Sequence, residues 1–316
     1  MKQSRKIALA AVVVAGLATV PWWGSAVLVQ FGISALILAT LAQSWNIIGG
    51  YTGYPSFGNS VFYGLGGYGV AIGMAQFQLP FVFGLSLGVL LAVSFAFVIG
   101  LPVLRLRGHY FAIATLGLAE VMTAIVSNLE IAGRNVGLIL PLLKGDTVFY
   151  ELSLGLLALT TLVVAWLSRS RFGFGLIAIR ENEAAAAVMG VNTTLYKVLA
   201  LALCSVFAAL AGGIHAYWIT YLDPSSAFDI TLNIKMIIMA VFGGPGTIFG
   251  PVLGAFALSA ISEILASKIT HLASVFFGVV IVGAIVFMPR GFADLVQRFR
   301  QLGWRYFQEN IRVHRV

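Results

Sequence analysis

Residues 81–104 read FVFGLSLGVLLAVSFAFVIGLPVL and contain no charged side chain. A helix needs about 20 apolar residues to cross the hydrocarbon core of a bilayer, so this stretch predicts a transmembrane helix. Similar apolar runs occupy residues 7–23, 27–48, 56–78, 109–128, 151–167, 197–221 and 272–289, with a pair of shorter segments within 231–267. The sequence therefore predicts an all-α polytopic membrane protein.

The composition of the whole chain agrees with this class. Its 316 residues are 60% hydrophobic and 9% charged, with a mean hydropathy of +0.98, whereas globular chains carry roughly 25% charged residues. This length leaves room for about eight to ten crossings and for no separate soluble domain, so residues 1–316 are interpreted as one transmembrane domain. No cleavage site follows the run 7–23, and we expect it to remain as a span.

The positions of the charged residues predict the topology. Lysine and arginine in short loops collect on the cytoplasmic side, and an amino terminus placed inside puts most of the 19 basic residues there. These are Lys2, Arg5, Lys6, Arg105, Arg107, Arg169, Arg171, Arg180, Lys197 and the arginines from Arg290 to Arg315. Both termini, the tail 290–316 and the segment 168–197 are then cytoplasmic. Ten crossings satisfy this pattern, and so do eight with two re-entrant segments.

Two glycine-rich stretches interrupt the apolar pattern. GGYTGYPSFGNSVFYGLGGYGVAIG, residues 49–73, includes Gly58, and GGPGTIFGPVLG, residues 243–254, includes Gly246, Gly250 and Gly254 at fourfold spacing. Irregular backbone at membrane depth is tolerated only where protein or a wet cavity covers it. We therefore expect broken or re-entrant segments that face inward. Fourfold glycine spacing also permits close helix packing, and a role in packing and a role in the translocation path both stay open.

Polar residues within the apolar runs are candidates for a translocation path. Glu120 lies near the middle of its run, where a lone charge costs roughly 2.5 to 3.5 kcal/mol. We expect it to face the bundle interior or to be neutralised, either as a wall of the path or as a hydrogen-bonded link between helices. The further candidates, with the same two interpretations, are Asn46, Ser56, Asn59 and Asn233.

The sequence carries no pattern typical of an enzyme or of a cofactor site. Its single cysteine, Cys204, excludes an intramolecular disulfide and a cysteine metal cluster, and no histidine has partners at metal-ligand spacing. The chain has no G-x-x-x-x-G-K-[ST] phosphate loop and no recognisable Ser, His and Asp arrangement. We predict no catalytic residue, no metal and no cofactor, and we attribute the net charge of +8 to membrane topology, not to nucleic-acid binding.

RFGFGLIAIRENEAAAAVMGVNTTLYK, residues 171–197, is the only long interior stretch typical of a water-soluble helix. Its strong helix formers predict a helix from Arg180 to Met189, ended by Gly190. Such a helix can occupy a groove of a cytoplasmic partner, although a plain connecting loop is the other interpretation. The candidate residues of this coupling segment are Arg180, Glu181, Glu183, Ala184, Ala185 and Gly190.

Four stretches resemble signatures of one family. RSRFGFGLIAIRENEAAAAVMGVNTTLYKVLAL resembles the coupling segment of the membrane subunits of branched-chain amino acid ABC importers, the LivM-type permeases. NIIGGYTGYPSFGNSVFYGLGGYGVA, LRLRGHYFAIATLGLAEV and FGGPGTIFGPVLGAF resemble their other signatures, in the expected order over residues 40–292. The segment departs from the E-A-A-x-x-x-G pattern of other importers, because four residues separate Ala185 from Gly190.

The resemblance implies a permease that pairs with a second, homologous permease, two cytoplasmic ATPases and an extracytoplasmic binding protein. Such a complex imports branched-chain or other hydrophobic amino acids across the bacterial cytoplasmic membrane at the expense of ATP. A urea or short-amide permease of the same architecture is an alternative. A self-sufficient secondary transporter or channel is another, although the chain has few paired intramembrane charges for such a role.

Overall fold

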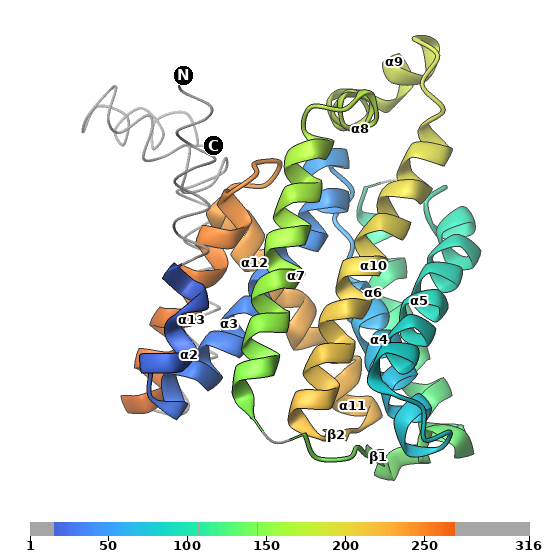
Figure 1. Ribbon diagram of the computed structural model, residues 1–316. Helices are drawn as coiled ribbons and strands as arrows, with labels where there is room; N and C mark the ends of the chain where they lie inside the picture. The colour runs from blue at the N-terminus through green and yellow to red at the C-terminus, as the bar shows by residue number, and fades with distance from the viewer. Residues whose placement is uncertain (1–15, 107, 144, 269–316) are drawn as a thin grey trace.

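The computed structural model describes residues 16–106, 108–143 and 145–268, and within them the chain is a bundle of helices (Figure 1). The all-α class is therefore confirmed. The helices are α2 (Val20–Trp23), α3 (Ala26–Trp45), the π-helix η1 (Asn46–Tyr51), α4 (Asn59–Ala75), α5 (Phe81–Val103), α6 (His109–Asn128), the 3-10 helices η2 (Glu130–Ala132) and η3 (Arg134–Val136), α7 (Asp146–Leu167), α8 (Arg171–Glu181), α9 (Glu183–Val188), α10 (Thr193–Ile219), α11 (Pro224–Ala227), α12 (Ile230–Gly243) and α13 (Gly250–Lys268).

Six helical segments of the described chain are long and apolar enough to cross a membrane. They are Ala26–Tyr51, Phe81–Val103, His109–Asn128, Asp146–Leu167, Thr193–Ile219 and Pro224–Gly243. Shorter helices, α4 and α13, occupy two further apolar runs. The predicted span 272–289 and most of the span 7–23 lie outside the described residues, so the total of eight or ten crossings stays a prediction.

The first glycine-rich stretch runs from one end of the bundle to the other, whereas the second joins the end of α12 to the start of α13. Gly53 and Gly246 lie against Arg180 of α8, whereas Met74 of α4 lines a pocket with Ile139 at the opposite end. At that end β1 (Leu138–Ile139) pairs antiparallel with β2 (Tyr221–Leu222), directly before α11. We call the two ends the α8 end and the β1 end. In the described chain, α4 and α12 therefore traverse the bundle and are not re-entrant.

Close backbone contacts pack α4 against its neighbours α5 and α10. A Cβ atom on Gly66 would lie 2.0 Å from the carbonyl oxygen of Ala209 in α10, and one on Gly69 would lie 2.2 Å from the Cα of Gly88 in α5. Small residues allow such an approach in membranes, where van der Waals packing replaces the hydrophobic effect between helices. The glycines of α4 therefore serve packing within a regular helix.

The irregular backbone is confined to two short segments. The first break, residues 46–58, comprises the π-helix η1 and the stretch that leads into α4. The second break, residues 244–249, separates α12 from α13. Most residues of the first break are buried, among them Asn46 and Tyr51, so this break faces inward as expected. In the second break only Gly244 is buried, whereas Thr247 and Phe249 are exposed, so the expectation is not met there.

Candidate functional site

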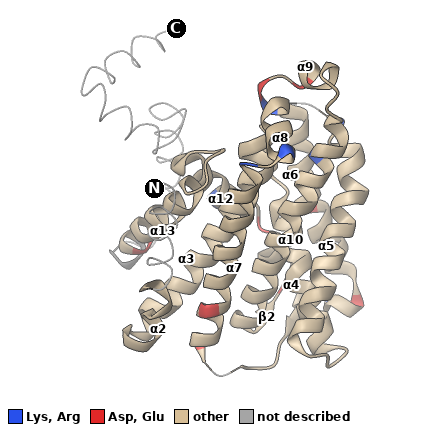
Figure 2. Ribbon diagram, turned by 45° about the horizontal axis from the view of Figure 1, so that its top comes forward, with Lys and Arg blue, Asp and Glu red and all other residues tan. Residues whose placement is uncertain are grey.

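The coupling segment lies outside the bundle at the α8 end, where α8 and α9 follow α7 (Figure 1) and where basic and acidic residues both occur (Figure 2). The single helix expected from Arg180 to Met189 is wrong, because Asn182 is extended at φ −161° and separates α8 from α9. Its side-chain oxygen accepts the Ala185 amide at 3.0 Å, as is typical of a helix N-cap. Gly190, at φ +88°, follows the end of α9.

The helix α9 presents an apolar surface to its surroundings. Among its residues only Ala186 is buried, and Ala184 and Ala185 are exposed. Val188 and Met189 are 88% and 83% exposed, although sequence reasoning named neither as a candidate. They could have been identified from the sequence, because they are two large apolar residues at the end of an otherwise charged segment. Contiguous exposed apolar surface marks an interaction site.

Arg180, a candidate of the coupling segment, contacts both breaks. Its Nη1 donates to the carbonyl oxygen of Gly50 at 3.0 Å. A Cβ on Gly53 would lie 2.8 Å from its Cγ, and one on Gly246 would lie 2.6 Å from its Nη1. Both glycines have a left-handed φ, +73° and +76°, which side chains disfavour. Arg180 also pairs with Glu181 at 3.1 Å, so the guanidinium joins α8 to the two breaks.

The two breaks are also hydrogen-bonded to each other. The Asn46 amide donates to the carbonyl of Thr247 at 2.9 Å, and its oxygen accepts the Gly246 amide at 2.7 Å. Gln43, one turn earlier, donates to the carbonyl of Ile248 at 2.8 Å. Asn46 is fully buried. A residue predicted for the path thus satisfies the irregular backbone of the second break.

Lys197 of α10 contacts three residues. We call Lys197, Glu183, Tyr54 and Leu104 together the Lys197 cluster. Its ammonium lies 2.7 Å from the Glu183 carboxylate, 3.0 Å from the Tyr54 hydroxyl and 3.0 Å from the Leu104 carbonyl. The Tyr54 hydroxyl also donates to Glu183. The side chains of the ion pair are only 3% and 16% exposed. Sequence reasoning placed Glu183 and Lys197 in one segment but did not pair them.

The remaining polar path candidates lie in the interior between helices. Asn233 of α12 accepts the Ser60 amide at 2.8 Å and donates to its hydroxyl at 2.6 Å. Asn59 donates to Cys204 of α10 at 3.1 Å, and its side-chain oxygen has no hydrogen-bond partner among the described residues. Ser56 is buried as well. These residues surround the amino-terminal end of α4, and their role in a path stays a prediction.

The four glycine candidates occupy close approaches. A Cβ on Gly58 would lie 3.0 Å from the backbone of α6, and one on Gly254 would lie 2.1 Å from the carbonyl of Met239 in α12. A Cβ on Gly250 would lie 2.6 Å from the carbonyl oxygen of Gly243, the last residue of α12. Gly246 lies within the second break. The stripe of fourfold spacing therefore begins outside the helix α13.

Glu120 lies on the exposed face of α6. The residues of α6 that turn toward the bundle are Phe111, Thr115, Ala119, Met122 and Val126. Of the two expectations for Glu120, the one that turns it toward the interior of this chain's own bundle is therefore wrong, and its neutralisation stays a prediction. In a membrane both faces of α6 are apolar, so the sequence pattern could not show which face packs inward.

Comparison with known proteins assigns this architecture to a family. The family model described as branched-chain amino acid transport system / permease component matches residues 27–285. The chain belongs to this permease family. Two relatives are the high-affinity branched-chain amino acid transport system permease proteins LivM of Salmonella typhimurium and Escherichia coli. Each is 27% identical, over 85% and 93% of this chain and 70% and 76% of the relative.

A more distant relative of the permease is the autoinducer 2 import system permease protein LsrC of Photorhabdus laumondii. It is 28% identical over 51% of this chain and 50% of its own length. No solved structure matches the chain. The family match confirms the resemblance seen in the four stretches. The chain is therefore a transport subunit and is itself a multi-pass membrane protein.

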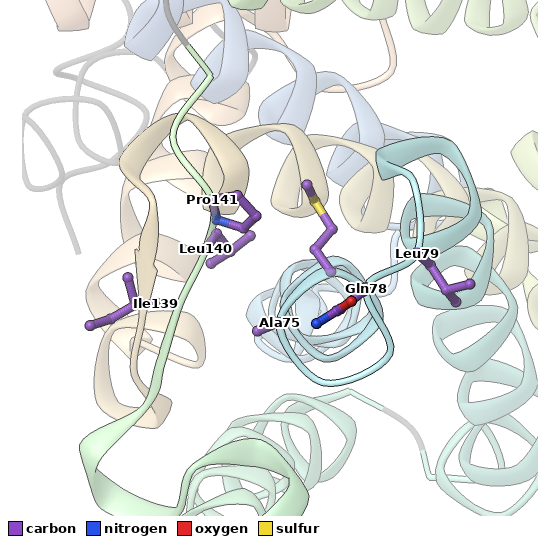
Figure 3. Close-up of a pocket in the computed structure, with 7 residues that line it drawn as sticks. Ala75, Gln78, Leu79, Ile139, Leu140 and Pro141 are labelled. Carbon is purple, nitrogen blue, oxygen red and sulfur yellow. The ribbon is translucent and has the colours of Figure 1, made fainter.

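At the β1 end the permease has a pocket of about 570 Å³ (Figure 3). It lies between the end of α4 and β1, and its lining residues are Met74, Ala75, Gln78, Leu79, Ile139, Leu140 and Pro141. None of these side chains titrates. Within the described residues no group of three or more His, Cys, Asp or Glu side chains could hold a metal ion.

Proposed function

We propose that this permease is the membrane-spanning subunit of an ATP-binding-cassette importer in the bacterial cytoplasmic membrane. It pairs with a second homologous permease, receives substrate from an extracytoplasmic binding protein and is driven by two cytoplasmic ATPases. The cargo is a branched-chain or other hydrophobic amino acid, as the family description and the names of the LivM relatives suggest. The match over residues 27–285 supports a single permease domain over 1–316, and we propose no cofactor.

The distribution of charge supports a cytoplasmic α8 end. Arg169 and Arg171 flank the start of α8. Arg105 follows Leu104, the residue after the end of α5, whose carbonyl accepts from Lys197. Acidic residues begin or precede helices at the β1 end, among them Asp146 of α7. By the positive-inside rule the α8 end then faces the cytoplasm. With a first span over 7–23 and a last one over 272–289, both termini and the tail 290–316 lie on that side.

The main support for the proposal is that the coupling segment, which contains the exposed apolar helix α9, contacts both breaks through Arg180. The outward surface of α9, with Ala185 and Val188, fits a groove of a partner, as amphipathic helices do. Behind that surface Arg180 contacts the first and the second break. An ATPase that moves α9 would therefore move the irregular backbone inside the bundle. Transporters place such breaks at their substrate pathways.

The exposed position of Glu120 supports pairing with a second permease. A carboxylate near the middle of a span is too costly to face lipid, so another protein surface or water must cover it. We propose that α6 faces the second permease and that Glu120 lines a path between the two subunits. Asn46, Ser56, Asn59 and Asn233 are instead buried in the interior of this chain, so their role in a path is a separate proposal. The side-chain oxygen of Asn59 is unsatisfied among the described residues.

Affinity purification from mildly solubilised native membranes tests the proposal, with every co-purifying protein identified by mass. We expect a second permease and an ATPase to co-purify with the chain in stoichiometric amounts. A matched preparation carrying Ala185→Arg and Val188→Arg should lose the ATPase and retain the second permease. Recovery of the chain alone, with transport intact after reconstitution, would contradict the proposal and favour a self-sufficient carrier or channel.

A further inference from the structure

Lys197 differs from every other charged side chain that the structure describes, because it alone is buried. Taking an ammonium out of water carries a large desolvation penalty, which is offset only by good ion-pair geometry and full hydrogen bonding. Lys197 meets both conditions. An ammonium has three N–H donors, and its three partners lie at 2.7, 3.0 and 3.0 Å. The ammonium also lies 4.4 Å from the centre of the Tyr54 ring, a favourable cation–π contact.

The three partners belong to three segments that are far apart in the sequence. Glu183 is the first residue of α9, Tyr54 lies in the first break, and Leu104 follows the end of α5. Tyr54 packs edge-on against Phe111 of α6 at 5.3 Å between ring centres. Lys197 itself lies near the start of α10, the helix that packs on α3, α4, α5 and α7. One ammonium thus joins the coupling segment to the core of the bundle.

Most of α9 is exposed, apart from its inward-facing residues. The helix spans only Glu183–Val188, and Ala186 is its sole buried residue. The Glu183 carboxylate turns inward to Lys197 and Tyr54, whereas Ala185 and Val188 are exposed. The inner side of α9 therefore contacts the bundle, whereas its outer side is exposed.

We propose that the ion pair of Glu183 and Lys197, with Tyr54 beside it, is the link that carries movement of α9 into the first break and α5. The inference rests on the proposed function, since it needs an ATPase bound to α9. The three side chains are positioning residues, because they hold α9, the first break and α10 in one geometry. A displaced Glu183 would leave the ammonium buried without its counter-ion, so the segments move together.

The test uses the complete importer, co-purified and reconstituted in liposomes, with leucine as the transport probe. Leucine uptake and ATP hydrolysis are measured on the same preparation for Glu183→Gln, Lys197→Met and Tyr54→Phe. We expect leucine transported per ATP hydrolysed to fall at least about fivefold, the lower range of typical coupling between sites, while the ATPase co-purifies as in the parent. The double variant Glu183→Gln/Lys197→Met should lose no more than the stronger single variant, because both remove one interaction.

The matched control is Glu130→Gln, which neutralises a carboxylate far from the coupling segment whose side chain is 79% exposed in its pair with Arg134. Its transport per ATP should be unchanged. An unchanged ratio of leucine transported to ATP hydrolysed in assembled Glu183→Gln and Tyr54→Phe complexes would overturn the proposed link. Loss of the ATPase from Glu183→Gln would also overturn it, because Glu183 would then belong to the docking surface. Absence of an ATPase from the parent preparation would instead contradict the proposed function.

Discussion

Asn46 and Gly246 lie 200 residues apart in the sequence, yet the Gly246 amide donates to the Asn46 side chain at 2.7 Å. The same side chain donates to the neighbouring carbonyl of Thr247. One buried side-chain amide therefore satisfies a donor and an acceptor of the irregular backbone of the second break. Together with Arg180, this contact makes the two breaks one structural unit at the α8 end.

Replacing Asn46 with Asp removes the donor to Thr247 and sets a carboxylate oxygen against its carbonyl. A buried polar group left unsatisfied costs about 1–3 kcal/mol, so we expect lower thermal stability in detergent and loss of uptake. Asn128→Asp is the control, because Asn128 also donates to a backbone carbonyl but is exposed at the end of α6. Equal melting temperatures for the two variants would show that Asn46 does not hold the breaks together.

Gly246→Ala tests the contact of Arg180 with the second break. The new Cβ would require φ near +76° and would lie 2.6 Å from the Arg180 guanidinium. A left-handed residue with a side chain costs about 1–2 kcal/mol, so we expect reduced stability and uptake. Gly155→Ala in α7 is the control, since nothing lies within 4 Å of its added Cβ. Uptake measured in liposomes should be lower for Gly246→Ala than for Gly155→Ala. Equal uptake by the two variants would show that the contact with Arg180 is unimportant.

The sequence predicted what depends on local pattern. The apolar runs placed the spans, and the polar, alanine-rich stretch placed the segment outside the bundle. The Asn182 cap could also have been predicted, because asparagine before Glu183 is a typical helix start. The pairing of Asn46 with Gly246 could not, since nothing local specifies a partner 200 residues away. The Lys197 cluster depends likewise on where α5 and the first break end.

Burial was the least predictable property. In a soluble helix an apolar stripe shows which face packs inward, but α6 is apolar on most sides, and the outward position of Glu120 became evident only from the structure. The glycines of α4 posed the same problem. Their number suggested broken helix, whereas Gly66 and Gly69 serve close packing of a regular one.

Val188→Arg and Leu142→Arg form a matched pair of surface variants. Both replace a large exposed apolar side chain, 88% and 84% exposed, at opposite ends of the molecule. We expect Val188→Arg to reduce ATPase recovery by at least about tenfold, the effect of about 1.4 kcal/mol of binding free energy. Leu142→Arg should leave recovery unchanged. Quantitative mass spectrometry of the purified complexes measures both, and equal recovery would exclude α9 as the docking helix.

Glu120→Gln keeps the size of the side chain and removes its charge. Because the carboxylate is exposed on α6, we expect normal insertion and folding but an altered rate of uptake. Glu130→Gln, in the exposed η2 segment beyond α6, is the control and should transport like the parent. Initial uptake rates over a range of leucine concentrations provide the measurement. Identical rates for Glu120→Gln and the parent would remove Glu120 from the path.

The most direct test of the account is leucine uptake into liposomes that contain the co-purified complex, with ATP enclosed or omitted. We predict uptake that requires both ATP on the α8 side and the binding protein on the β1 side, and that Val188→Arg abolishes. Uptake by the chain alone, without ATP and unaffected by Val188→Arg, would contradict it.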